Sequence, residues 1–328
     1  MAAAPIDVAV VGATGVLGEA LLDGLSTAPF PLGRVYALAS DRTAGGEVDC
    51  GHRRLTVERA DPFDFRQAQL VLLAAPAAVA AGLGPELREA GCLVVDASGS
   101  LDTADWFVPG RPRAGVRALR LPLPGVTQAL SVLLPLSRLG AIEALEVLEL
   151  RAVSGRGMAA VRELGQQTAD VLNFRNWSPQ AYPQQIAFNL LPSMGDETDG
   201  MLAEEAVAVA QVQHQLPGVA VHWTQAEMPV FYGFGQHLTV RLSAPVTPRQ
   251  VTECLAATEG LCWGGEAAED RPSPVTHASG DDQIHLSRLR LAAAGEQTLR
   301  LWSVADNVRA AGVAPMLRAA RLLVDEYL

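Results

Sequence analysis

A glycine-rich turn near the start of the chain constrains its fold more than any other feature. The apolar run Ile6–Val11 precedes Gly12, Gly15 and Gly18, and the sequence then has helical character to about residue 26. Glycines at this spacing let the backbone approach a pyrophosphate, and the amino end of the following helix supplies N–H groups that bind it. We therefore predict a dinucleotide-binding strand–turn–helix unit. The alternative is a tight turn without a ligand.

Alternation of strands and helices continues through the first third of the sequence. Short apolar runs at 34–40, 68–75 and 92–96 predict strands, and residues 79–90 predict a helix. This alternation is typical of a parallel, doubly wound sheet. We predict an α/β Rossmann domain.

The pattern of predicted strands and helices changes at about residue 128. Long extended runs now mix with a few helices, which indicates an α+β domain with a mainly antiparallel sheet. The last apolar helix, 311–327, is long enough to return to the first domain. We place one domain at 1–127 with 307–328 and the other at 128–306. Helices are predicted over 128–139, 157–173 and 203–215, and strands over 144–154, 219–224, 237–243, 283–291 and 298–305.

Composition excludes several classes of function. A chain of 328 residues accommodates two domains, and its net charge of −11 disfavours nucleic-acid and anionic-membrane partners. No apolar run reaches the roughly 20 residues of a membrane span, so we expect a cytoplasmic protein. The cysteines lack metal-ligand spacing and are expected to be reduced, with Cys92 in the core. They are Cys50, Cys92, Cys254 and Cys262.

The end of the second predicted strand discriminates between nicotinamide cofactors. An NAD site usually has an acidic residue there, which accepts from the ribose 2′-hydroxyl. This region instead contains Ser40, Arg42 and Thr43. Arginine and hydroxyl groups bind a 2′-phosphate through charge-assisted hydrogen bonds, whereas a carboxylate would repel it. Asp41 is the residue that argues for NAD, and we predict NADP.

Four later motifs extend this interpretation along the chain. They read VSGRG at 153–157, QIAFNLLP at 185–192, MPVFYG at 228–233 and DNVR at 306–309. Together with the two cofactor motifs, they resemble the aspartate-β-semialdehyde dehydrogenase family, a group of oxidoreductases of amino-acid biosynthesis. The resemblance implies a Rossmann domain, an α+β domain that forms a homodimer, and a C-terminal helix that returns to the first domain.

The motifs and the resemblance together define the expected cofactor contacts. We expect them at Gly12, Ala13, Thr14, Gly15, Val16, Leu17, Ser40, Arg42, Thr43, Ala75, Ser98, Ser154, Gly155 and Asn307.

The resemblance also implies a catalytic cysteine, which this sequence does not supply. In that family a thiolate attacks the aldehyde, hydride passes to NADP, and phosphate releases an acyl phosphate. Alignment on Gln128 places the cysteine at Pro124, and a small shift places it at Gly125 or Val126. None of these residues is a nucleophile, and the hydroxyl of Thr127 is a weak one.

Other functional positions of the family also carry different residues. The histidine base falls on Phe234 and the substrate-binding arginine on Glu227. A phosphate-binding arginine falls on Asp102 and a phosphate-binding lysine on Val207. The two acidic replacements would repel an anion and could favour an amine. His237 is the nearest candidate for a relocated base, although we expect it to begin a strand.

Three hypotheses follow from these observations. The first is a dimeric, NADP-binding pseudoenzyme, similar to the cysteine-variable paralogs called Usg proteins, which could also pair with an active paralog. The second is an active NADP-dependent aspartate-semialdehyde dehydrogenase, or a related oxidoreductase, with a displaced catalytic group. The third is a purely structural dimer whose glycine turn is vestigial.

Overall fold

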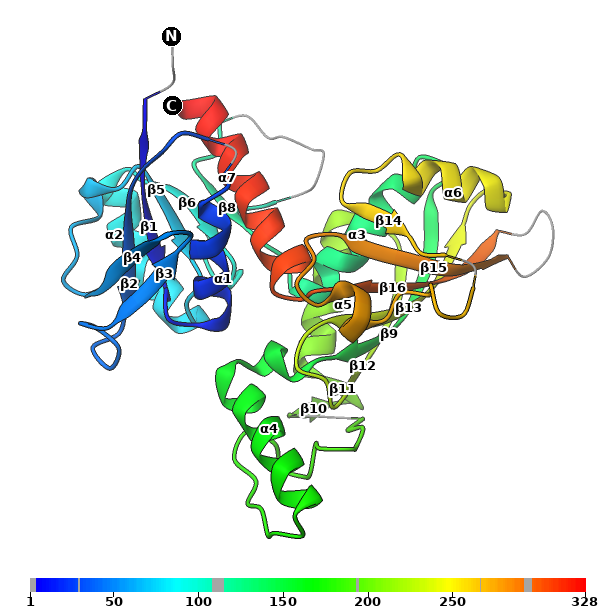
Figure 1. Cartoon of the computed structure of the whole chain (residues 1–328). Coiled ribbons are helices and arrows are strands. Elements are labelled where there is room, and N and C mark those ends of the chain that lie inside the picture. Colours follow the sequence, from blue (N-terminus) through cyan, green and yellow to red (C-terminus); the bar gives the residue numbers. More distant parts are fainter. Residues whose placement is uncertain (1–3, 29, 108–114, 193–194, 266, 292–296) are drawn as a thin grey trace. The chain divides into compact units, whose positions relative to one another are not determined.

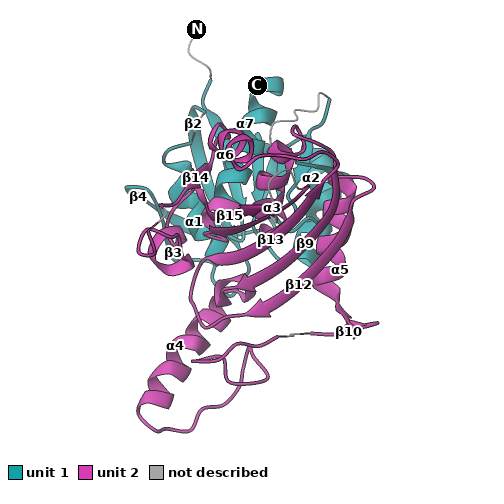
Figure 2. Ribbon diagram, turned by 90° about the vertical axis from the view of Figure 1, so that its right-hand side faces the viewer, with its two compact units in different colours: residues 1–123, 312–328 teal, residues 124–311 magenta. Residues whose placement is uncertain are grey.

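The chain divides into two compact units in the computed structural model. Unit 1 comprises residues 1–123 and 312–328, and unit 2 comprises residues 124–311 (Figure 2). The structure describes residues 4–28, 30–107, 115–192, 195–265, 267–291 and 297–328.

Unit 1 is built on one eight-stranded sheet with the order β3-β4-β2-β1-β5-β6-β8-β7. All of its pairings are parallel except the β3–β4 hairpin. The predicted Rossmann architecture is therefore confirmed. The strands are β1 (Ile6–Val11), β2 (Leu32–Ala39), β3 (Glu47–Cys50), β4 (Arg53–Arg59), β5 (Leu70–Leu73), β6 (Leu93–Asp96), β7 (Asp105–Trp106) and β8 (Ala118–Arg120).

Helices cover both faces of this sheet because its central strands are apolar on both sides. In β1, Val8 and Val10 belong to the core under α1 (Val16–Leu25) and α7 (Ala314–Tyr327). The intervening Ala9 and Val11 belong to the opposite core, under α2 (Ala77–Ala90). Such continuous burial is typical of parallel strands.

The C-terminal helix returns to unit 1, as predicted, and lies beside β6 and α1 (Figure 1). Met316 and Ala319 on this helix are fully buried. The predicted single helix from 311 to 327 is wrong in its first turn, because a π-helical turn, Arg309–Val313, precedes α7. Pro315 stands near the start of α7, where a proline fits because the first N–H groups of a helix have no partner within it.

Unit 2 is built on a six-stranded sheet with the order β12-β9-β13-β16-β15-β14. The three central pairings are antiparallel and the two edge pairings are parallel, so the predicted mainly antiparallel sheet is confirmed. The strands are β9 (Ile142–Arg151), β12 (Ala220–Glu227), β13 (Phe234–Leu242), β14 (Leu261–Trp263), β15 (Ile284–Leu291) and β16 (Thr298–Ala305); a separate small hairpin joins β10 (Glu197–Thr198) and β11 (Met201–Leu202).

Three helices pack on one face of this sheet: α3 (Pro124–Leu136), α5 (Ala203–Gln215) and α6 (Pro248–Ala256). A fourth, α4 (Met158–Leu172), packs against a loop core that includes Tyr182 and Ile186. The prediction that α3 begins at residue 128 is wrong by four residues, because Pro124 starts it. Short helical turns complete the chain: η1 (Phe65–Gln67), η2 (Val153–Arg156) and η3 (Pro274–Ala278).

Candidate functional site

The glycine turn after β1 is held so closely that two of its positions exclude a side chain. Gly12 has a φ of +88°, and a Cβ on it would collide with the carbonyl oxygen of Ala74. A Cβ on Gly18 would collide with the carbonyl oxygen of Gly12. The N–H groups of Gly12 and Ala13 both donate to the Leu38 carbonyl, at 2.8 and 3.0 Å. The backbone is thus fixed in the form that exposes a helix amino end to an anion.

The turn after β1 and the loop after β2 meet at the carboxyl edge of the sheet. The hydroxyls of Thr14 and Thr43 lie 3.2 Å apart. Arg42 is exposed and forms no ion pair within the described part of the chain. Asp41 pairs with Arg59 at 2.5 Å, so the one carboxylate that argued for NAD already has a cationic partner.

Backbone hydrogen bonds attach the Arg42 loop, residues 40–46, to strand β4 near the C-terminal end of the loop. The N–H of Gly45 donates to the Val57 carbonyl at 2.9 Å, and the N–H of Val57 donates to the Gly46 carbonyl at 2.8 Å. Strand β4 then pairs with β2 in parallel. The loop is therefore anchored to the sheet on both sides.

Ser98 follows β6 at the same edge. The buried carboxylate of Asp96 accepts hydrogen bonds from the Ser98 N–H and hydroxyl, at 2.8 and 2.6 Å, and from the Leu101 N–H at 3.0 Å. Ala75 follows β5 and lies next to Gly12, whose Cβ would meet its nitrogen at 3.0 Å. The predicted unit 1 cofactor residues thus gather where ligands of doubly wound sheets bind.

Three motifs of unit 2 converge on one side chain. The amide oxygen of Asn307 accepts from the Ser154 hydroxyl and from the Gly233 N–H, both at 3.0 Å. A Cβ on Gly155 would lie 3.0 Å from the Phe234 ring. The structure therefore brings Ser154, Gly155 and Asn307 together with the position expected for the histidine base.

The position expected for the cysteine lies in the first turn of α3. The space beside Gly125 is filled by the carboxyl group of Glu149, so a Cβ there would collide with it. Glu149 is buried and accepts from Trp223 Nε1 at 2.9 Å and Gln225 Nε2 at 2.8 Å. Burial raises the pKa of this carboxyl, although Arg151 and these hydrogen bonds act in the opposite direction.

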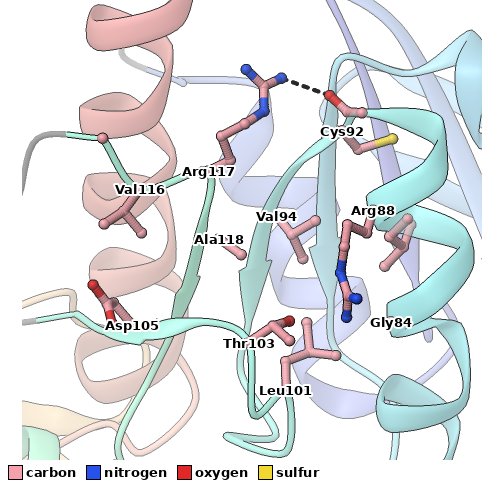
Figure 3. A pocket seen from close by; sticks show the side chains of 13 residues that line it. Gly84, Arg88, Cys92, Val94, Leu101, Thr103, Asp105, Val116, Arg117 and Ala118 are labelled. Carbon is pink, nitrogen blue, oxygen red and sulfur yellow. Dashed lines mark hydrogen bonds between the residues drawn. The ribbon is translucent and has the colours of Figure 1, made fainter.

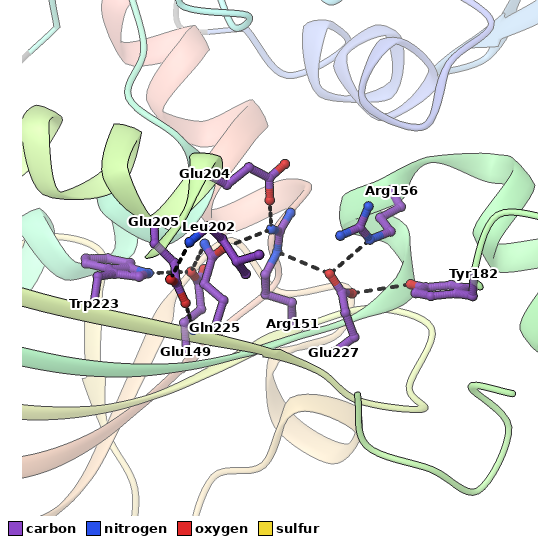
Figure 4. A network of polar contacts seen from close by, with 10 residues as sticks. All are labelled: Glu149, Arg151, Arg156, Tyr182, Leu202, Glu204, Glu205, Trp223, Gln225 and Glu227. Carbon is purple, nitrogen blue, oxygen red and sulfur yellow. Dashed lines mark hydrogen bonds and ion pairs between the residues drawn. The ribbon is translucent and has the colours of Figure 1, made fainter. Parts of the chain in front are cut away.

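Glu227 belongs to a buried network that we call the polar cluster (Figure 4). Its carboxylate pairs with Arg156 Nε at 3.0 Å and accepts from the Tyr182 hydroxyl at 3.3 Å. Arg151 lies 4.0 Å from Glu227 and also pairs with Glu204. The polar cluster comprises Glu149, Arg151, Arg156, Tyr182, Glu204, Glu205, Trp223, Gln225 and Glu227.

The ion pairs inside the polar cluster change the role that we expected of Glu227. We expected its charge to repel an anion or attract an amine, but two guanidinium groups already compensate it. Burial and the charge of Glu227 raise the pKa of the Tyr182 hydroxyl, which therefore stays protonated. Asp102 is fully exposed, and Val207 lies exposed on α5.

His237 lies inside β13 and not at its start, which corrects the prediction. Phe234 and Gln236 are buried, and Gln236 donates to the Gly125 carbonyl at 2.8 Å. Because side chains alternate along a strand, His237 faces the opposite side from Phe234, three residues away. It lines an open hollow of about 300 Å³ with residues such as Glu146 and His222. His237 therefore cannot act as a relocated base beside Gly125.

None of the cysteines has the surroundings of an activated thiol. Burial raises the pKa of Cys50, Cys92 and Cys254, which opposes thiolate formation. The Cys92 thiol donates to the carbonyls of Phe65 and Ala68 at 3.3 and 3.4 Å, as expected of a core residue. Cys92 also borders a cavity of about 370 Å³ between α2 and strands β6 and β8 (Figure 3). Cys262 is half-buried in β14.

Within the described residues, no group of three or more His, Cys, Asp or Glu side chains is placed to hold a metal ion. Nor does any helix in the described ranges have the length and apolarity needed to span a membrane.

A Rossmann unit with an intact glycine turn and a second unit on a mixed sheet define a two-domain, dinucleotide-binding oxidoreductase class. The family model "Semialdehyde dehydrogenase, NAD binding domain" matches residues 7–134, and "Semialdehyde dehydrogenase, dimerisation domain" matches residues 133–310. The chain belongs to the semialdehyde dehydrogenase family. A nicotinamide dinucleotide is the cofactor class that the first match implies, and the closely packed turn at Gly12 and Gly18 fits it.

Individual relatives include both kinds of protein that the resemblance implied. The chain is 35% identical to a USG-1 protein homolog of Pseudomonas aeruginosa, over 99% of each chain. It is 32% identical to an aspartate-semialdehyde dehydrogenase of Legionella pneumophila, over 98% of this chain and 97% of that one. The crystal structure of aspartate semialdehyde dehydrogenase II of Vibrio cholerae, complexed with ASA, matches with a TM-score of 0.93 at 31% identity, covering 99% of this chain and 100% of that one.

Sequence reasoning missed most of the polar cluster. Glu149 and Arg151 lie two residues apart on a strand whose other inward residues are apolar, such as Leu145 and Val147. Two charges on the buried side of a strand require partners, because an unpaired buried charge is costly. The two charged residues on the buried side of this strand were therefore the sequence feature that could have predicted a buried polar network.

Proposed function

We propose that this protein is an NADP-binding homodimer that does not carry out the thiol-dependent dehydrogenase reaction, and that it acts as a pseudoenzyme or cofactor-binding module. The observation that carries the proposal is the start of α3. Pro124, Gly125 and Val126 have no nucleophilic side chain, and the Glu149 carboxyl group occupies the space beside Gly125. Phe234 and Glu227 support it, because neither can act as a histidine base or an anion-binding arginine.

The preference for NADP over NAD is part of the same proposal. It rests on the exposed Arg42, the Thr14–Thr43 contact and the pairing of Asp41 with Arg59. The further cofactor roles of Ser154, Gly155 and Asn307 stay predictions, as do the cytoplasmic location and pairing with an active paralog.

The decisive test is phosphate-dependent reduction of NADP with aspartate semialdehyde as substrate. The purified protein should show no turnover above a blank without protein, while an authentic family enzyme does under the same conditions. It should still bind NADPH in a fluorescence titration. Turnover that stays with the protein through purification, and survives replacement of all four cysteines by serine, would contradict the proposal and require another nucleophile.

One arrangement favours a second candidate, an oxidoreductase that needs no thiol. The Glu149 carboxyl lies against Gly125, one of the positions expected for the nucleophile, and its pKa is raised by burial. A protonated carboxyl at that position could donate a proton to a carbonyl. When bound, the nicotinamide cofactor would supply the hydride in such a reaction. NADPH oxidation with a panel of short aldehydes tests this candidate, and Glu149→Gln should abolish any activity found.

A further inference from the structure

The cavity between α2 and strands β6 and β8 lies beside a crossover that has no helix in its described residues. Parallel strands are usually joined by a helix, which then covers the strands that it connects. Helix α2 makes this connection from β5 to β6. The described residues between β6 and β8, 97–107 and 115–117, contain only the two-residue strand β7. The face of β6 and β8 beside α2 is hollowed here to a volume of about 370 Å³.

Apolar side chains form the floor and walls of this cavity. Val94 on β6 and Ala118 on β8 are partners in the parallel pairing, and both belong to the core on the α2 side of the sheet. Leu87 on α2, Leu101 and Val116 also line the cavity (Figure 3). Pockets for small molecules in proteins have volumes of about 300–1,000 Å³ and are lined mainly by apolar side chains with a few polar groups. The cavity therefore has the size and lining of a ligand site.

Arg88 adds an uncompensated positive charge to the cavity. It is exposed in the last turn of α2, and its side chain forms no ion pair or hydrogen bond among the described residues. In Figure 3 this side chain extends from α2 along the cavity. Arg117 also lines the cavity, but it is already held against the Tyr327 ring at 4.9 Å and donates to the Gly91 carbonyl at 2.6 Å. Asp105 is the one carboxylate among the lining residues, so the lining attracts anions.

This cavity is separate from the regions expected to bind the cofactor. None of the expected cofactor contacts lines it, and neither do Ser100 and Asp102 of the loop after β6. It reaches Gly91 and Arg117, which precede β6 and β8 at the amino edge of the sheet. Dinucleotides bind at the opposite, carboxyl edge of doubly wound sheets. A ligand in the cavity is therefore distinct from the dinucleotide.

We propose that this cavity binds a small amphipathic carboxylate, whose apolar body lies over Val94 and Ala118 and whose carboxylate pairs with Arg88. Removal of the apolar body from water supplies most of the affinity. The guanidinium of Arg88 supplies specificity for the carboxylate through charge-assisted hydrogen bonds. Inorganic phosphate fits this site poorly, because it has no apolar part to bury. This inference goes beyond cofactor binding and does not depend on it.

The test is calorimetric titration of the full-length protein with octanoate and with octan-1-ol, an uncharged ligand of the same length. Octanoate should bind about tenfold more tightly than octanol, which is the value of one charge-assisted contact. Arg88→Gln should remove this difference and leave the affinity for octanol unchanged. Failure of the wild-type protein to bind octanoate, or equal weakening of both ligands by Arg88→Gln, would overturn the proposal.

Arg162→Gln is the matched control. Arg162 is an exposed helical arginine of α4, in unit 2, and it also lacks an ion pair among the described residues. Its replacement removes the same charge from the protein and should leave both affinities unchanged. A loss of octanoate affinity equal to that in Arg88→Gln would overturn the proposal, because net charge alone would then explain the binding.

Two further measurements locate the bound octanoate. Ala118→Leu places a larger side chain on the floor of the cavity and should weaken octanoate and octanol alike by tenfold or more, without lowering the thermal unfolding midpoint. Unchanged affinities in this variant would overturn the proposal by placing the ligand elsewhere. Octanoate should also bind equally well with saturating NADPH or with inorganic phosphate present. Displacement by either would assign octanoate to the carboxyl edge of the sheet and overturn the proposal.

Discussion

The carboxyl edge of unit 1 and the polar cluster of unit 2 differ in the exposure and the ion pairing of their charged side chains. At the edge of unit 1, Arg42 is exposed and Arg120 has one buried N–H group without a partner in the described residues. In the polar cluster, Glu227 is 3% exposed and its charge is shared between two arginines. The first region leaves the Arg42 guanidinium without an ion pair among the described residues, whereas the second pairs its buried charges with one another. Hydrogen bonding does not separate the two regions, because Arg151 Nε, like Arg120 Nε, has no hydrogen-bond partner among the described residues. An anionic ligand could therefore meet Arg42 without breaking an ion pair, whereas in the polar cluster it would have to break one.

Replacement of Glu227 by Ala should produce the largest effect on stability. It would leave Arg151 and Arg156 without their shared carboxylate, and breaking a buried ion pair costs about 3–5 kcal/mol. Urea unfolding measures this loss. Glu253→Ala is the control, because its partnership with Arg249 is exposed and should be worth under about 0.5 kcal/mol. A loss below about 1 kcal/mol for Glu227→Ala would show that the polar cluster is not internally satisfied.

Replacement of Arg42 by Ala should weaken NADPH binding by about tenfold to a hundredfold, which corresponds to roughly 1.5–3 kcal/mol. The physical reason is loss of a charge-assisted contact to the 2′-phosphate. Fluorescence titration measures the affinity, and NADH serves as the matched ligand because it lacks that phosphate. Equal weakening of NADPH and NADH would contradict the assignment of Arg42 to the 2′-phosphate.

Replacement of Gly125 by Ala should destabilise the protein by about 1–3 kcal/mol, the range for an overpacked core. The added methyl group would have to displace the Glu149 carboxyl. Thermal unfolding of Gly125→Ala, Glu149→Ala and the double variant tests this directly. The double variant should be less destabilised than the sum of the single ones, because the methyl then enters vacated space. Additive losses would mean that Glu149 does not fill this position.

The pH dependence of stability should show the smallest effect. Because the pKa of Glu149 is raised in the folded protein, folding favours its protonated form. Its stabilising contribution is therefore complete below the ordinary glutamate pKa and is lost as pH rises toward the folded value. Between pH 5 and 8, the wild type should lose stability relative to Glu149→Gln, which mimics the protonated form. Parallel stability curves for the two proteins would show that Glu149 titrates normally.

Features that depend on neighbouring residues could be predicted from the sequence, and features that depend on distant partners could not. The glycine turn, the Arg42 loop and the returning helix follow from local spacing and apolar periodicity. The β3–β4 hairpin was missed because its strands are largely exposed and therefore lack an apolar run. The start of α3 was missed because apolar periodicity alone placed the first turn at Gln128.

The candidate site likewise contains features that the sequence alone shows and features that depend on distant residues. The absence of a cysteine at 124–126 is a statement about sequence and needed no coordinates. The neutralisation of Glu227 needed them, because Arg156 and Tyr182 lie 71 and 45 residues away from it along the chain. The direction of His237 depended on the register of β13, which a one-residue shift reverses.

The hydrogen bonds between Gly45, Gly46 and Val57 affect the conformational entropy that would be lost when a cofactor binds. A loop that orders only on binding loses conformational entropy at that moment, and the loss weakens affinity. The Arg42 loop is instead fastened by backbone hydrogen bonds to strand β4, which itself pairs with β2. These bonds are part of the fold, so the entropy of the Arg42 loop is lost during folding and need not be lost on binding.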